Sequence, residues 1–175
     1  MRFRTSAAVA ISVAVAGITV ATSQAAMAAP QPAQSLRTCA EAQLRYSFGG
    51  RYGNPTQRIQ VIKLTNKGSS ACTLRGFPGV ELIGTVLKTK NYRWPLVQQR
   101  AHYSTVTLRP GRTAHFNLIY LPFAAGDGNP IAVREIVIIP PNDSRHATLT
   151  WHQQVLLQDA ATHPGTYISP VVAGA

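Results

Sequence analysis

The segment from Lys88 to Trp94 concentrates the residue types that bind anionic ligands. Its candidate binding residues are Lys88, Lys90, Tyr92, Arg93 and Trp94. In an extended backbone, the four at even positions would share one side, because side chains alternate along a strand. Such a stripe could bind anionic wall polymers, lipid head groups or nucleic acid through charge attraction and ring stacking. The alternative is a solvated hairpin tip with Trp94 buried beneath it.

Other side chains that could do chemistry do not fall into catalytic or metal-binding patterns. The histidines are His102, His115, His146, His152 and His163. His146 and His152 could pair on a strand, but zinc sites need three or four ligands. No G-x-S-x-G motif is present, and the aspartates are far apart beside turn-forming residues. We therefore expect a non-catalytic protein, with no catalytic residues, no metal and no cofactor. The alternative is a small secreted hydrolase or an enzyme inhibitor.

The only two cysteines, Cys39 and Cys72, are expected to form one structural disulfide. They lack the C-x-x-C spacing of redox pairs, and exported proteins keep their cysteines oxidised. The bridge would close a loop of about 34 residues and stabilise the fold by roughly 3–4 kcal/mol in the chain-entropy model. It would link the first strand region to the loop after the second strand. A catalytic thiol or a redox pair is the alternative.

The charge balance is strongly basic but sparse. Seventeen lysines and arginines against six acids give a net charge of +11, although charged residues are only 13% of the chain. So few acids argue against two-carboxylate catalysis and carboxylate metal cages. An apolar share of 45% also excludes a charge-rich disordered chain.

The first 28 residues have the pattern of a secretory signal peptide. Arg2 and Arg4 precede an apolar run from Ala7 to Val20, and Ala26-Met27-Ala28 matches an A-x-A cleavage site. That run is about fourteen residues, short of the ~20 that span a bilayer, and a retained membrane anchor is the alternative. Cleavage would leave fifteen cations and six acids, a net charge of +9.

Behind the signal, we expect a flexible leader over residues 29–38 and a single domain over residues 39–175. The leader is rich in proline and glutamine and has nothing to bury. The product would be a monomer that is secreted or associated with the cell wall. Its expected partners are anionic wall polymers or lipid head groups, and no nucleic acid.

Short apolar or alternating runs between Gly/Pro turns predict an all-β domain. The expected strands are Leu44–Phe48, Arg58–Thr65, Gly79–Val86, Leu96–Arg100, Thr105–Arg109, Thr113–Leu121, Val133–Ile139, Thr148–Trp151 and Thr166–Val172. Strands at this spacing favour an immunoglobulin-like β-sandwich of about eight strands with one disulfide. A small closed β-barrel is the alternative. In the turn at Phe77-Pro78-Gly79, Gly79 would take a positive φ and Phe77 would enter the core.

Nearly all of the chain after the signal, beginning at Cys39, resembles the domain of unknown function 4232 family, found in secreted and lipid-anchored proteins of actinobacteria. The matching residues are Leu64-Thr65-Asn66, Ala71 to Leu82, Leu108-Arg109-Pro110-Gly111 and Gly165 to Val172, in the family's order. The resemblance implies a secreted β-sandwich and no known reaction. Members often carry a second cysteine pair, which this chain lacks.

Overall fold

The computed structural model of the chain describes residues 35–87, 90–124, 127–158 and 161–174, which belong to one compact unit. The predicted signal peptide and most of the predicted leader lie outside these residues. Among the described residues, no helix is long and apolar enough to cross a membrane. The elements are η1 (Glu41–Gln43), β1 (Leu44–Gly53), β2 (Arg58–Asn66), β3 (Cys72–Arg75), β4 (Gly79–Val86), β5 (Lys90–Pro95), β6 (Val97–Gln98), β7 (Thr105–Leu108), β8 (Thr113–Tyr120), β9 (Pro130–Ile139), β10 (Ala147–Leu156), β11 (Tyr167–Ile168) and β12 (Val172–Ala173).

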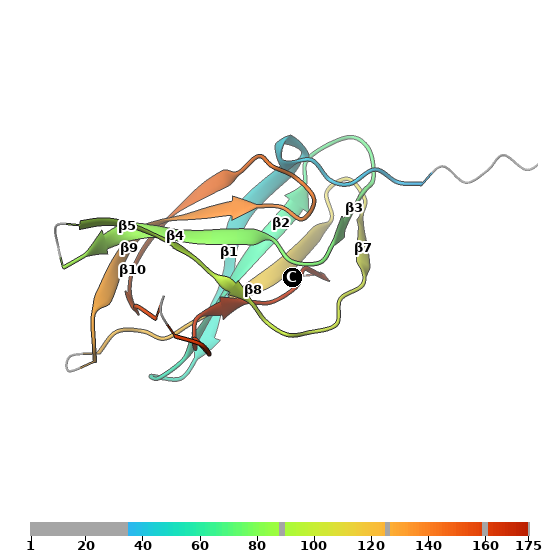
Figure 1. Cartoon of the computed structure of the whole chain (residues 1–175). Coiled ribbons are helices and arrows are strands. Elements are labelled where there is room, and N and C mark those ends of the chain that lie inside the picture. Colours follow the sequence, from blue (N-terminus) through green and yellow to red (C-terminus); the bar gives the residue numbers. More distant parts are fainter. Residues whose placement is uncertain (1–34, 88–89, 125–126, 159–160, 175) are drawn as a thin grey trace, which may run out of the picture. The chain divides into compact units, whose positions relative to one another are not determined.

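The strands form two main sheets and a small ribbon (Figure 1). The six-stranded sheet has the order β1-β2-β8-β11-β6, and β12 also pairs with β8. The four-stranded sheet has the order β10-β9-β4-β5, and β3 pairs with β7 in a two-stranded ribbon. Neither main sheet closes on itself, so the predicted β-sandwich is confirmed and the closed barrel is excluded.

The core lies between the two main sheets because apolar residues alternate along their strands. In β8, the alternating residues Ala114, Phe116, Leu118 and Tyr120 are all buried. The four-stranded sheet contributes buried Leu82, Ile136, Ile138 and Trp151. The ring of Tyr120 meets that of Trp151 edge to face, with centroids 5.0 Å apart, which joins the two layers.

Several strand boundaries differ from the prediction. β1 continues past Phe48 to Gly53, because Gly49 and Gly50 lie in a bulge of its pairing with β2 rather than in a turn. β3 and β5 are additional strands, each too short or too polar to show an apolar alternation. The last predicted strand is divided into β11 and β12, separated by Pro170, which lacks an N–H for a ladder.

The turn after β3 differs from the prediction in its glycine. Gly76, not Gly79, has the positive φ, of +96°. Phe77 is partly buried against the core, and its ring meets Tyr103 edge to face at 5.7 Å. Gly111, in the Pro110-Gly111 turn before β8, also has a positive φ, of +74°.

The predicted disulfide between Cys39 and Cys72 is present, with the Cα atoms 4.9 Å apart. Cys72 is the first residue of β3, whereas a loop was expected there. The backbone on either side is paired as well, because Cys39 N–H donates to Thr73 O and Thr73 N–H donates to Arg37 O, both at 2.9 Å. The bridge therefore fastens the β3–β7 ribbon to the start of the domain.

Candidate functional site

The structure separates the residues of the predicted cation–aromatic stripe. Trp94 is only 4% exposed and belongs to the core. Tyr92 is half-buried against the same core, and Lys90 is exposed at the start of β5. Arg93 points the other way and forms an ion pair with Glu81. Lys88 lies outside the described residues.

The direction of Trp94 follows from the pairing of β5 with β4. Trp94 lies opposite buried Leu82, and residues directly opposite in a pair share a face of the sheet. Side chains two positions apart on a strand lie on the same face, so the rings of Tyr92 and Trp94 both face the core. Trp94 offers no ring for stacking on a ligand, and binding by this segment stays a prediction.

The remaining tryptophan is buried as well, and the histidines of the described residues belong to no cluster of metal-ligating side chains. Trp151 is 5% exposed in the core. No group of three or more metal-ligating side chains occurs among the residues that the structure describes. Nδ1 of His115 is 2.6 Å from the carbonyl oxygen of Gly174, a backbone partner rather than a carboxylate.

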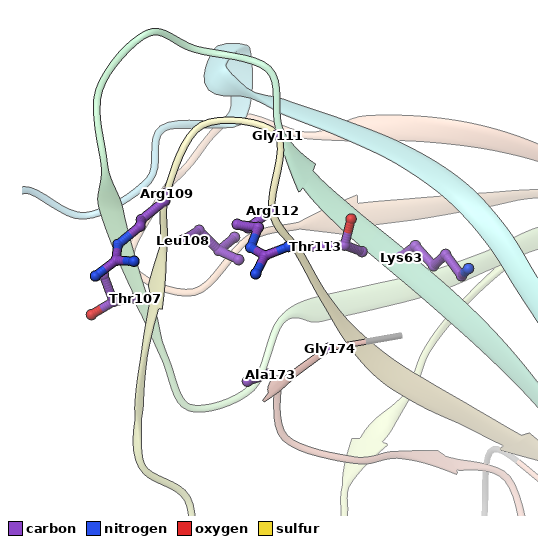
Figure 2. A pocket seen from close by; sticks show the side chains of 9 residues that line it. All are labelled: Lys63, Thr107, Leu108, Arg109, Gly111, Arg112, Thr113, Ala173 and Gly174. Atoms are coloured by element: carbon purple, nitrogen blue, oxygen red, sulfur yellow. The ribbon is translucent and has the colours of Figure 1, made fainter.

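A basic hollow lies on the outer side of the six-stranded sheet and is named here the basic trough. Its volume is about 630 Å³, within the usual range for ligand sites. It is lined by Lys63, Thr107, Leu108, Arg109, Gly111, Arg112, Thr113, Ala173 and Gly174 (Figure 2). The ribbon strand β7, the β7–β8 turn, β2 and β12 thus contribute to one surface.

The turn between β7 and β8 positions the two arginines of the trough. Arg112 N–H donates to Arg109 O at 3.0 Å and closes a four-residue turn. Pro110 and Gly111 occupy its centre, where proline presets φ and glycine tolerates the positive φ. Both guanidinium side chains are exposed, one at each end of the turn.

Asn66, at the end of β2, holds this turn against the sheet. Its backbone N–H donates to Arg112 O (3.0 Å), and its carbonyl accepts from Gly111 N–H (2.8 Å). Its fully buried side chain donates from Nδ2 to Leu108 O at 2.9 Å and to Ser70 O at 2.8 Å. Buried amide groups need such partners, so Asn66 ties the loop after β2 to the trough turn.

Lys63, on β2, is the third cation that lines the trough. It lies opposite His115 of β8 on the outward face, while its neighbours Ile62 and Leu64 enter the core. A Cβ atom at Gly49 would come within 3.0 Å of Lys63 Cε. The glycine in the β1 bulge therefore leaves room for the lysine stem to lie along the sheet.

The described strands of the sheet that carries the trough contain no acid. The strands of the six-stranded sheet contain four cations and neither Asp nor Glu. Those of the four-stranded sheet contain three cations and two acids, Glu81 and Glu135. Within the described residues, the ion pairs join Arg93 to Glu81 and Arg145 to Asp143, so none neutralises a trough cation.

The trough leaves no continuous pattern in the sequence, because its cations are far apart in the chain. Lys63 and Arg112 are separated in the chain by the five strands β3 to β7 and become neighbours through the β2–β8 pairing. A weak local signal did exist, since an arginine lies on each side of the Pro110-Gly111 turn. Nothing in the local pattern around Lys63 connects it with that turn.

The comparisons agree with the resemblance that the sequence shows. The model of the domain of unknown function (DUF4232) matches residues 39–169, three quarters of the chain. The chain belongs to this family. No curated protein sequence and no solved structure matches it. The DUF4232 match covers the disulfide, the ribbon, the trough turn and both sheets up to β11, so the trough is built almost entirely within the family domain.

Proposed function

We propose that this DUF4232 protein is an exported, non-catalytic binding domain that attaches to an anionic ligand of the cell envelope or its surroundings. The observation that carries the proposal is the basic trough on a sheet whose strands hold no acid. Unpaired cations on one face create a positive potential that attracts polyanions and favours one orientation of the protein. The signal-peptide pattern at the N-terminus supports export.

Fractionation of the producing cells tests the export. We expect the chain that begins near Ala29 in the medium or the wall fraction. A full-length chain recovered with the cytoplasm would contradict export.

A pull-down of the purified chain from Ala29 onward tests the binding. Isolated cell wall, wall polysaccharides and anionic lipid vesicles would be compared at low and high salt. We expect retention at low salt and release at high salt, because raising the ionic strength from about 0.1 M to about 1 M shortens the screening length between exposed charges from about 10 Å to about 3 Å. Retention that survives high salt would contradict a charge-driven attachment, and retention by none of the materials would contradict the proposed function.

A further inference from the structure

The arrangement of charges in the basic trough points to the shape of its ligand, an inference that rests on the proposed function. Figure 2 shows the charged ends of Arg109, Arg112 and Lys63 one after another along the hollow, not converging on one point. We propose that the trough binds a linear polymer with oxyanion groups on successive units, which lies along this row of cations.

Backbone geometry gives the length of the row. Arg109 and Arg112 close a four-residue turn, so their Cα atoms lie within about 7 Å. Lys63 lies opposite His115, three residues beyond Arg112, which corresponds to about 10 Å along a strand. A single compact anion contacts one or two of these groups, whereas a chain contacts all three.

The chemistry of the lining suits oxyanions in water. Guanidinium groups bind phosphate and carboxylate through paired N–H donors, and lysine adds a mobile point charge. Thr107 is exposed on the trough wall and can donate from its hydroxyl.

The lining also favours a dissolved polymer over a membrane surface. Leu108 is only 1% exposed, and none of the exposed large apolar side chains of the described residues lines the trough. A membrane-docking face inserts such side chains between lipid head groups.

Competition against a fluorescent long-chain polyphosphate, followed by anisotropy, tests this inference. Three competitors at equal total phosphate test the effect of chain length: orthophosphate, triphosphate and unlabelled long-chain polyphosphate. Polygalacturonate tests a carboxylate polymer, and phosphatidylglycerol vesicles test a lipid surface. We expect affinity per phosphate to rise at least about tenfold from orthophosphate to the long chain, because linked groups bind with a high effective concentration.

Two triple variants with the same change in charge locate the binding. Lys63→Gln/Arg109→Gln/Arg112→Gln removes the row, and Lys90→Gln/Arg93→Gln/Arg134→Gln removes three cations from the four-stranded sheet. We expect at least about tenfold weaker binding for the first and less than about twofold for the second. The single variants Arg109→Gln and Arg112→Gln, at exposed positions, serve if the triple variant fails to fold.

The outcomes separate the two proposals. Equal affinity per phosphate for orthophosphate and the long chain would overturn the linear polymer, as would binding to vesicles alone. Equal losses in both triple variants would overturn the trough as the site. Each of these results leaves an anion-binding protein, whereas no binding to any polymer, wall material or vesicle overturns the proposed function itself.

Discussion

Asn66 is the residue on which the geometry of the trough depends most directly. Two of its side-chain partners are carbonyl oxygens and the third is the N–H of Gly68, which donates to Oδ1 at 2.9 Å. This set determines the orientation of the amide, since only Nδ2 can donate to carbonyls. A short polar side chain can thus hold the loop after β2 and the turn before β8 together.

Replacing Asn66 with alanine should destabilise the domain by at least about 2 kcal/mol, because two carbonyl oxygens lose their donors. Urea unfolding measures this loss. Asn66→Asp should also destabilise, since a carboxylate cannot donate to Leu108 O. The control is Asn91→Ala, at an exposed position on β5, with an expected change within about 0.5 kcal/mol. A neutral Asn66→Ala would show that water replaces the lost partners.

Asp143 is a second residue whose contacts reach across the chain. Its Oδ2 accepts from Glu41 N–H at 2.6 Å, and its Oδ1 accepts from the N–H groups of Ser144 and Arg145 at 2.7 and 3.1 Å. The Glu41 bond lowers the pKa of the carboxyl most, followed by the Arg145 N–H, because hydrogen bonds favour the ionised form.

A lowered pKa means that the carboxylate stabilises the fold above its unfolded value, near pH 4, and that this contribution is lost as the pH falls through the folded pKa. Asp143→Asn should therefore lower the unfolding free energy at pH 7, with a difference from the unaltered protein that shrinks below pH 4. Urea unfolding at a series of pH values measures this difference. A deficit that stays constant down to pH 2 would mean that the variant has lost packing rather than charge.

At the scale of elements, the β3–β7 ribbon is the part of the trough with the fewest partners. It is a sheet of only two strands, and isolated pairs of strands are marginally stable. The disulfide to Cys39, the pairing of Thr38 with Thr73, and Asn66 connect it to the rest of the fold. The position of Arg109 at the end of β7 therefore depends on these connections.

Removing the bridge with Cys39→Ala/Cys72→Ala should lower the unfolding free energy by roughly 3–4 kcal/mol in the chain-entropy model. It should also weaken binding to a long polyanion, because the wall that carries Arg109 loosens. Urea unfolding and anisotropy measure the two effects. Dithiothreitol should reproduce both in the unaltered protein and leave the double variant unchanged. Binding unaffected by either treatment would show that backbone pairing alone holds the ribbon.

At the scale of the whole molecule, charge is distributed unevenly between the two sheets. The described acids lie on β4 and β9, in η1, or in the loops at the two ends of β9. The six-stranded sheet has none on its strands, and its cations repel one another in the free protein. Salt should therefore have opposite effects on stability and on binding.

We expect added sodium chloride to raise the thermal midpoint of the free protein and to weaken its binding to polyphosphate. A plot of the logarithm of the binding constant against the logarithm of the salt concentration should have a slope of about −2. Each of the three cation–phosphate contacts to a flexible polyanion contributes roughly −0.7 to that slope. Calorimetry and anisotropy at matched salt concentrations measure the two quantities. The triple variant of the trough should have a flatter slope than its charge-matched control. Equal slopes would place the ionic contacts elsewhere on the surface.

Much of the fold could be predicted from local patterns. Alternation identified the buried face of β8, the boundaries of β4 and the sandwich class, because inward and outward positions repeat every two residues along any strand. β3 and β5 were missed because a four-residue strand and a polar edge strand leave little pattern. The disulfide followed from having only two cysteines.

The amino-acid sequence alone shows which side chains are hydrophobic enough to be buried, which cysteines pair, and how basic the chain is. Which cations become neighbours depends on how the strands pair in the folded protein. The segment around Lys90 looked like a binding stripe, yet its pairing with β4 turns Trp94 inward. Lys63 and Arg112 looked unrelated, yet the β2–β8 register brings them to one trough. Alternation is a local property of the backbone, whereas neighbours across strands depend on sheet order and register, which form through long-range contacts.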